Sequence, residues 1–326
     1  MKHIKLILQF VVACIIALLA YNVFYQPNSE SVKAQVRDKL PAPLKQEQTD
    51  AGVSQGKLKI TMLDIGQGDA ILLQDGKQNI MIDVGDSRVR KSKDGSAVDR
   101  GGKDALIKAL DKAGVQRVNT VFVTHHHSDH MGNIMTVRGK YSVKTIYDSG
   151  YKNDNFKTSV QLDKDLRSGQ YNNRVLKAGD TVKFGEGFYF EVLAPGNFLD
   201  QKLYKNINNT SLVMKLHYGD FTMLFTGDAE AGVEDALQQK YGAKLKADVL
   251  KVGHHGSRTS SYWKFIKKVQ PKYALISCGP FGIYQHPNKD VVGRLQKLGA
   301  KVLTTYDHGN IIVTTDGNSF DVKTER

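Results

Sequence analysis

The chain has 326 residues with 46 Lys and Arg against 33 Asp and Glu, so its formal net charge at pH 7 is +13. Hydrophobic residues make up 40% of the sequence, which is enough for a proper core and excludes a wholly disordered protein. The two cysteines, Cys14 and Cys278, lie in unrelated segments and are not expected to pair, which excludes a disulfide-stapled scaffold.

Residues 1–25 have the features of a membrane-targeting segment. Lys2, His3 and Lys5 precede an apolar run over residues 6–25, and about 20 such residues suffice to cross a bilayer. Positive charge on the short leading side favours an orientation with the N-terminus inside and the rest outside. We therefore expect an uncleaved signal-anchor at residues 1–25 and an extracellular domain at the cell membrane. The alternative is a cleaved signal peptide, which would make the protein secreted.

Residues 26–56 are expected to form a disordered linker. Pro27, Pro41 and Pro43 interrupt a run rich in Gln, Ser, Glu, Lys and Asp that has little periodicity. Such a segment cannot bury enough apolar area to offset its chain entropy. The folded domain is therefore expected at residues 57–326.

Strands and helices alternate along residues 57–326. Strands are expected at residues 58–63, 70–74, 78–83, 118–123, 144–147, 188–193, 212–216, 221–225, 248–252 and 273–277, with further strands at the end of the chain. Helices are expected at residues 103–113, 129–137, 231–239, 262–269 and 288–298, whereas the polar stretch 153–168 gives no clear pattern. This order indicates a layered fold of the α+β or α/β class.

The most informative motif follows the expected strand at residues 118–123. His125-His126-His127-Ser128-Asp129-His130 reads His-x-His-x-Asp-His. Imidazole nitrogens and carboxylate oxygens are the ligands that zinc, manganese and iron accept. Alternating ligands on an extended turn can converge on one point, and the adjacent Asp129 and His130 can reach a second. The same alternation points His126 away from the metals and gives it a structural role.

Three other expected strands also end in ligand-type side chains. Asp83 ends the strand at residues 78–83, and Asp228 follows the strand at residues 221–225. His254 and His255 follow the strand at residues 248–252. In layered α/β folds such strand ends meet at one edge of the sheet and form the site.

As a set, these residues resemble the motifs of the metallo-β-lactamase superfamily. A narrower resemblance, to the C-terminal hydrolase domain of the competence ComEC family, rests on four segments: Asp64-Ile65-Gly66-Gln67-Gly68-Asp69-Ala70, Asn208-Asn209-Thr210-Ser211, His254-His255-Gly256-Ser257, and Tyr284-Gln285-His286-Pro287. The resemblance covers residues 58–322. It implies an αββα sandwich behind a single N-terminal hydrophobic anchor, and two divalent metal ions, zinc or manganese.

The resemblance also implies roles for individual residues. His125 and His127 would bind the first metal, and Asp129, His130 and His254 the second. Asp228 would bridge both metals, because a carboxylate has two oxygens. His254 is preferred to His255 because Val252-Gly253-His254 matches the superfamily's strand-Gly-His ending. His255 would then face the substrate or act as an acid. The catalytic residues are expected to be Asp129, His255 and His286, with His286 over the leaving group.

A wider set of residues is expected around this centre. Asp64 and Asp83 should orient ligand histidines or hold loop amides. Asp69 is either a turn acid or a residue of the site. A phosphate or a base of the substrate is expected to contact two loops, through Ser257, Arg258, Thr259, Ser260 and Tyr284.

One departure from the family pattern concerns the first metal. The superfamily usually has a third histidine for it, yet no His occurs between His130 and His217. His217 lies beside the turn at residues 218–220 and is expected to be exposed, at the far end of the hairpin from Asp228. Asn208 and Asn209 stand where the third histidine would be. An amide oxygen is a weaker ligand than imidazole, so the first metal is expected to bind loosely or to be manganese.

The basic composition favours a polyanionic substrate, with DNA as the leading candidate. A divalent metal lowers the pKa of bound water to about 7, which makes hydroxide available for hydrolysis. We therefore expect a phosphodiesterase or nuclease acting on DNA outside the membrane, alongside an unknown DNA-uptake partner. The second hypothesis is a phosphodiesterase of cell-surface polymers, like the teichoic-acid phosphorylcholine esterases. The third is a non-catalytic, metal-stabilised binding module.

Overall fold

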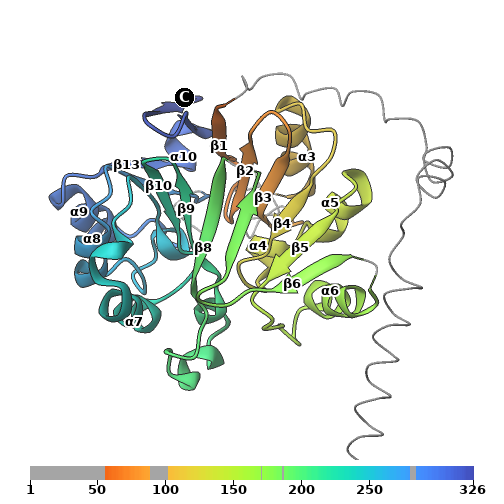
Figure 1. Cartoon of the computed structure of the whole chain (residues 1–326), viewed down its shortest axis with the longest axis horizontal. Helices are drawn as coiled ribbons and strands as arrows, with labels where there is room; N and C mark the ends of the chain where they lie inside the picture. Colours follow the sequence, from red (N-terminus) through yellow and green to blue (C-terminus); the bar gives the residue numbers. More distant parts are fainter. Residues whose placement is uncertain (1–55, 89–101, 170, 186, 280–283) are drawn as a thin grey trace, which may run out of the picture. The chain divides into compact units, whose positions relative to one another are not determined.

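The computed structural model of the protein describes residues 56–88, 102–169, 171–185, 187–279 and 284–326 (Figure 1). The expected anchor at residues 1–25 lies outside this part of the chain, as does all of the expected linker except Gly56. Among the residues that the structure describes, no helix is both long enough and apolar enough to cross a bilayer.

Two β-sheets form the centre of the described part. The eight-stranded sheet has the order β15-β14-β1-β2-β3-β4-β5-β6, and the seven-stranded sheet has the order β13-β12-β11-β10-β9-β8-β7. The strands of the first are β1 (Leu58–Met62), β2 (Ala70–Gln74), β3 (Asn79–Val84), β4 (Thr120–Phe122), β5 (Thr145–Asp148), β6 (Asn172–Val175), β14 (Ile311–Thr315) and β15 (Phe320–Thr324). Those of the second are β7 (Thr181–Phe184), β8 (Phe188–Ala194), β9 (Val213–Tyr218), β10 (Phe221–Phe225), β11 (Val249–Lys251), β12 (Tyr273–Ile276) and β13 (Lys301–Thr304).

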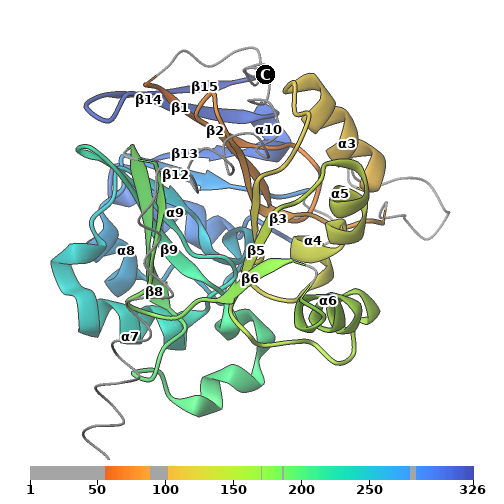
Figure 2. The ribbon, with the colours of Figure 1, turned by 45° about the vertical axis from the view of Figure 1, so that its right-hand side comes forward.

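Helices cover the outer face of each sheet, as Figures 1 and 2 show. The first sheet carries α3 (Lys103–Lys112), α4 (Ser128–Met131), α5 (Ile134–Lys140) and α6 (Lys157–Arg167). The second carries α7 (Ala231–Tyr241), α8 (Trp263–Val269) and α9 (Lys289–Lys297), while α10 (Thr305–His308) follows β13. Short 3-10 helices are η1 (Gln201–Lys205), η2 (Ile207–Thr210), η3 (Gly242–Leu245) and η4 (Gly253–Gly256).

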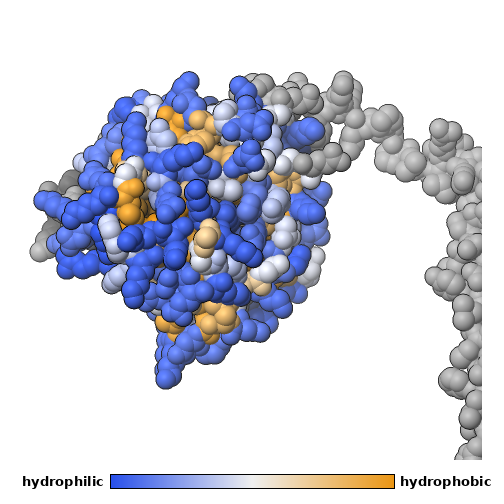
Figure 3. Space-filling view, turned by 60° about the vertical axis from the view of Figure 1, so that its left-hand side comes forward, coloured by the Kyte–Doolittle hydropathy of each residue, from blue (hydrophilic) through white to orange (hydrophobic). Residues whose placement is uncertain are grey.

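The apolar pattern of the central strands explains this layering. On β3, Ile80 and Ile82 pack into the core between the sheets, whereas Met81 and Val84 pack under the helices. A strand buried on both faces needs consecutive apolar residues, which β3 has at Ile80, Met81 and Ile82. The face in Figure 3 is mostly hydrophilic with small separate hydrophobic patches. The expected layered fold with two sheets is therefore confirmed.

Some elements differ from the sequence expectation. The expected helix at residues 129–137 is two helices, α4 and α5, separated at Gly132 and Asn133. The stretch 153–168 contains α6, which buries Leu162 and Leu166 beneath an otherwise polar surface. The exposed strand β6 was not expected, because its sequence Asn-Asn-Arg-Val has no apolar alternation.

Candidate metal centre

The candidate site lies where four strand ends from the two sheets meet. Asp83 is on β3, and the His-x-His-x-Asp-His run follows its parallel neighbour β4. Asp228 follows β10, and His254 and His255 lie in η4 after its parallel neighbour β11. The carboxyl ends of parallel strands point to the same edge, so each sheet delivers ligands to one place.

The first group of candidate ligands is His125, His127 and Asp228, whose ligand atoms all lie within 4.8 Å of one another. Nε2 of His125 is 3.0 Å from Nδ1 of His127 and 3.8 Å from Oδ2 of Asp228. Burial holds the pKa of His125 well below its ordinary value and lowers that of His127. Both imidazoles are therefore neutral at pH 7, which is the form that binds a metal ion.

The second group is Asp129, His130 and His255, again with ligand atoms within 4.8 Å of one another. Nδ1 of His130 lies 2.7 Å from Oδ2 of Asp83, and Nδ1 of His255 lies 2.9 Å from the carbonyl oxygen of Ser277. Each contact fixes one ring nitrogen and directs Nε2 toward the centre. Such contacts are the usual means of orienting metal-binding histidines.

Asp228 lies between the two groups. Its Oδ2 is 3.2 Å from Nε2 of His130, 3.6 Å from Nε2 of His255 and 3.8 Å from Nε2 of His125. The Ser211 hydroxyl oxygen accepts a hydrogen bond from the Asp228 backbone N–H at 3.0 Å, which helps to fix the turn after β10. This position would allow one carboxylate to reach both groups.

The two late histidines occupy the reverse of their expected places. His255 is buried and joins Asp129 and His130, whereas His254 is 22% exposed with Nε2 3.7 Å from Asp228. His254 Nδ1 contacts the Thr259 hydroxyl at 3.0 Å and Glu230 at 3.4 Å. His254 had been preferred because Val252-Gly253-His254 matches the superfamily's strand-Gly-His ending. Both histidines have positive φ angles, 48° and 53°, and this left-handed backbone brings the second of them to the buried group.

The two expected orienting acids also differ from each other. Asp83 holds His130 and accepts hydrogen bonds from the Thr124 backbone N–H at 2.8 Å and hydroxyl at 2.7 Å. Asp64 instead pairs with Arg326 at 3.1 Å, and its backbone N–H donates to Asn310. Asp64 was expected to orient a ligand histidine or to hold loop amides, and the ion pair with Arg326 is the carboxylate contact seen for it.

Asp69 is a residue of the site and has a partner that the sequence did not reveal. Its Oδ2 is 2.8 Å from Nζ of Lys251, and both side chains are buried from solvent. Its Oδ1 is 3.5 Å from Nδ1 of His255. Burial alone would raise the pKa of Asp69, but the Lys251 ammonium and His255 hold it well below its ordinary range. Asp69 is thus an ionised carboxylate behind the second group.

Gly68 explains why a glycine precedes Asp69. Its φ is 128°, and a Cβ atom there would lie 2.3 Å from the carbonyl oxygen of Asp129. That carbonyl accepts the backbone N–H of Asp69 at 3.0 Å. The Gly-Gln-Gly-Asp segment can therefore approach the loop of the second group only without a side chain.

The Asn-Asn-Thr-Ser segment lies beside the first group. The Ser211 hydroxyl is 3.3 Å from Nδ1 of His125. Asn208 donates to Glu230 through Nδ2, and its buried Oδ1 makes no hydrogen bond within the described residues. Asn209 is structural, since its amide contacts Leu203 and Glu230 backbone groups. Asn208 and Ser211 are therefore the residues of this segment that could replace the missing histidine as a ligand of the first metal.

The remaining expected residues form the rim. The hydroxyls of Ser257 and Thr259 form a hydrogen bond of 3.1 Å, and the Thr259 hydroxyl also contacts Nδ1 of His254. Ser260 is structural, because its hydroxyl donates to the Ala229 carbonyl. Arg258 and Tyr284 are exposed. The His286 ring lies 5.5 Å from that of His254 and 6.4 Å from that of His255. Burial and the two neighbouring histidines lower the pKa of His286 to about 4, so its imidazole is neutral at pH 7.

Two histidines outside the groups have local partners. Nδ1 of His126 is 2.8 Å from the Ser159 hydroxyl, which anchors the metal-ligand loop to α6. His217 is half-buried rather than fully exposed, because its ring stacks on Tyr189 with centroids 4.7 Å apart.

Arg88 is a rim residue that sequence reasoning missed. Its Nε and one terminal nitrogen each donate to Asp86 at 3.0 Å, and that terminal nitrogen also donates to Ser128 at 2.8 Å. Ser128 directly precedes Asp129, so a guanidinium is held beside the site. No sequence pattern marks it, since Asp86 and Arg88 are ordinary loop residues.

The electrostatics of the centre fit divalent cations. Asp69, Asp83 and Asp228 are buried, and Asp129 is largely so, while Lys251 is the buried ammonium nearest to them among the described residues. Burial lowers the pKa of His255, yet the surrounding carboxylates, led by Asp228, raise it to about 9. Buried Asp228 Oδ1, His130 Nε2 and His255 Nε2 lack hydrogen bonds within the described residues. Such orphaned donor atoms are the ones that two cations would bind.

Comparisons with known proteins agree with this geometry. A sequence model described as the metallo-beta-lactamase superfamily matches residues 63–279. ComE operon protein 3 of Bacillus subtilis (strain 168) is 31% identical over 261 residues, which cover 78% of this chain and 32% of that protein. Competence protein ComA of Neisseria gonorrhoeae is 29% identical over 255 residues, with the same two coverages. The chain therefore spans about a third of the length of the curated relatives it matches.

A solved structure supports the fold. The metallo-beta-lactamase fold protein YhfI from Bacillus subtilis aligns with a TM-score of 0.52 and 14% sequence identity, over 79% of this chain and 100% of that protein. At this identity the likeness concerns the arrangement of the sheets and helices alone.

Proposed function

Because this chain belongs to the metallo-β-lactamase superfamily of metal-dependent hydrolases, we propose that its centre hydrolyses phosphodiester bonds, with DNA outside the membrane as the substrate. The observation that carries the proposal is the pair of three-residue ligand groups, together with the position of Asp228, which belongs to the first group and lies 3.2 Å from His130 of the second. His125, His127 and Asp228 would hold one divalent ion, zinc or manganese. Asp129, His130, His255 and Asp228 would hold the other.

The two ions, when bound, would activate water and neutralise charge on the phosphodiester group. The protein's own residues then orient the reactants. Asp83 and the Ser277 carbonyl fix the tautomers of His130 and His255, because each accepts from Nδ1 and leaves Nε2 to face the centre. His286, neutral at pH 7, would offer a hydrogen bond to the departing oxygen from the rim.

The choice of DNA rests on charge and on the relatives. The formal net charge of +13 favours a polyanion, and Arg88 supplies a guanidinium that Asp86 has already oriented. One relative is named a competence protein, and another is Recombination protein 2 of Haemophilus influenzae. We propose that the chain acts beside a DNA-uptake partner, anchored through residues 1–25 with its catalytic domain outside.

The test is hydrolysis by the purified protein loaded with zinc or with manganese. We expect cleavage of single- or double-stranded DNA. Asp228→Asn should lower the rate by more than about 100-fold, since it removes a ligand rather than a residue that orients one. Asp235→Asn, an exposed acid on α7, is the matched control and should keep full activity.

The same assay separates the competing functions. Hydrolysis of choline-bearing teichoic acid, with no cleavage of any polynucleotide, would replace the DNA proposal with the surface-polymer esterase. Metal binding without turnover of either substrate or of bis-para-nitrophenyl phosphate would indicate a binding module.

A further inference from the structure

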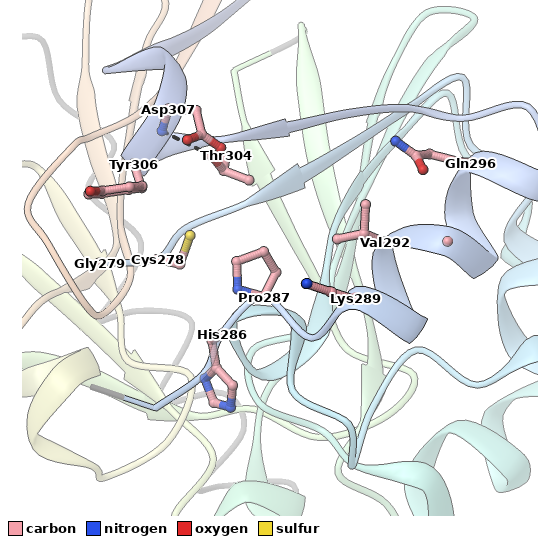
Figure 4. Close-up of a pocket in the computed structure, with 11 residues that line it drawn as sticks. Cys278, Gly279, His286, Pro287, Lys289, Val292, Gln296, Thr304, Tyr306 and Asp307 are labelled. Atoms are coloured by element: carbon pink, nitrogen blue, oxygen red, sulfur yellow. Dashed lines mark hydrogen bonds between the residues drawn. The ribbon is translucent and has the colours of Figure 1, made fainter. Parts of the chain in front are cut away.

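A cavity of about 460 Å³ opens beside the metal centre, on the side of His286. It lies between the residues that follow β12, one side of α9, and the junction of β13 with α10 (Figure 4). Its volume is in the range of small-molecule sites. His286 lines it at one end, and Gln296 and Tyr306 lie at the other sides of the view.

The cavity adjoins the site, because one residue belongs to both. His286 is among the residues that line the cavity, and its ring lies 5.5 Å and 6.4 Å from the rings of His254 and His255. A ligand bound at the metal centre would therefore reach this cavity by extending past His286.

The lining combines an apolar floor with a few polar groups. Cys278, Pro287 and Val292 make the floor, and burial raises the pKa of the Cys278 thiol to about 12, so it stays uncharged. Lys289 brings a positive charge. Gln296 adds an amide. The Asp307 carboxylate is already engaged, because it accepts from the Thr304 hydroxyl at 2.6 Å.

We propose that this cavity is a nucleotide subsite, which receives the base and sugar next to the scissile phosphate. The apolar floor and the exposed Tyr306 side chain suit the face of a base, and Gln296 and Lys289 suit its polar edge and the adjoining phosphate. A choline group fits less well, because it needs several aromatic faces or an available carboxylate, and the Lys289 ammonium repels it. This inference rests on the proposed phosphodiesterase function and names the part of the substrate that the site recognises.

The experiment compares substrates that share one scissile bond and one leaving group. Thymidine 3′- and 5′-(para-nitrophenyl phosphate) are each paired with the deoxyribose analogue that lacks the base. For at least one regioisomer, we expect kcat/KM to be about fivefold or more higher with the base, the lower range for stacking of one base. Binding of the dinucleotide pTpT to chelator-treated protein, measured by calorimetry, gives a second readout that needs no turnover.

Two variants and their controls assign the effect to the cavity. Tyr306→Ala should reduce the base preference, whereas Tyr189→Ala, at another exposed tyrosine, should not. Gly293→Leu should fill the cavity and abolish the preference without unfolding α9, because a Cβ atom there meets nothing within 4 Å. Gly139→Leu is its control, at a helical glycine of α5 with the same open space.

The outcomes are distinct. Equal kcat/KM with and without the base for both regioisomers, while DNA is still cleaved, overturns the subsite and leaves the proposed function standing. An undiminished preference in a folded Gly293→Leu variant also overturns it. Failure to hydrolyse DNA and all four esters contradicts the proposed function itself. In that case the subsite is judged by pTpT binding alone, and binding that neither cavity variant weakens would reject it.

Discussion

Replacing Lys251 by methionine tests whether the buried Lys251–Asp69 pair supports the fold behind the metal centre. Lys251 Nζ donates to Asp69 at 2.8 Å and to the Val252 carbonyl at 2.8 Å, and both side chains are almost inaccessible to solvent. Removing one partner of such a pair leaves an uncompensated buried charge and costs about 3–5 kcal/mol. We expect about 3 kcal/mol, because His255 and His130 also approach Asp69, at 3.5 and 3.8 Å.

The measurement is urea unfolding of the purified protein in excess chelator, so that metal binding does not add to stability. In a double-mutant cycle, Lys251→Met with Asp69→Asn should lose less than the sum of the single variants, with a coupling of about 2 kcal/mol. Lys272→Met is the control, since Lys272 pairs with Asp248 at 3.0 Å but is 66% exposed, and it should cost at most about 1 kcal/mol. A loss below about 1 kcal/mol for Lys251→Met, with no coupling, would refute the reasoning.

Three further predictions concern other parts of the molecule. Burial raises the pKa of Glu234 to about 8 from an ordinary 4.5. Its stabilising contribution to the unfolding free energy is therefore complete below about pH 4.5 and is lost as the pH rises through about 8. Glu234→Gln should flatten the pH dependence of the unfolding free energy, and an unchanged profile would contradict the assignment. Metal titration should give one tight and one weaker site, with His255→Ala losing an ion that His254→Ala retains; the reverse result would restore the order expected from sequence. Arg88→Ala should weaken DNA binding for all sequences and reduce the salt slope by about 0.7–0.9; a slope that changes only with Arg258→Ala would place the phosphate contact on the other loop.

The sequence predicted most strands because each is a short apolar run with an evident end. The same feature located the site, since ligand residues stand directly after those runs. It failed at α6 and β6, where few apolar residues mark the element and neighbouring packing decides its conformation. The superfamily resemblance is confirmed over residues 63–279, and the likeness to ComEC-type proteins is borne out by relatives such as ComE operon protein 3.

Details of the site depended on contacts that no local pattern encodes. Left-handed backbone at His254 and His255 turns the second histidine inward, which spacing alone could not show. Lys251 reads as a polar interruption of β11, and only the fold brings it to Asp69. Asp64 belongs to a motif that resembles a site segment, yet its partner is the last residue of the chain, Arg326.

The division of the metal ligands between the two sheets has a mechanical consequence. His125 to His130 follow a strand of the eight-stranded sheet, and Asp228 and His255 follow strands of the seven-stranded sheet. Ions bound by both groups would hold the two sheets together, because separating the sheets would separate the candidate ligands. Binding at 100 times the dissociation constant adds about 2.7 kcal/mol to the folded state. Scarcity of metal would thus loosen the closed sandwich and expose it to proteases, so the same supply of ions would govern both how fast the protein works and how long it survives.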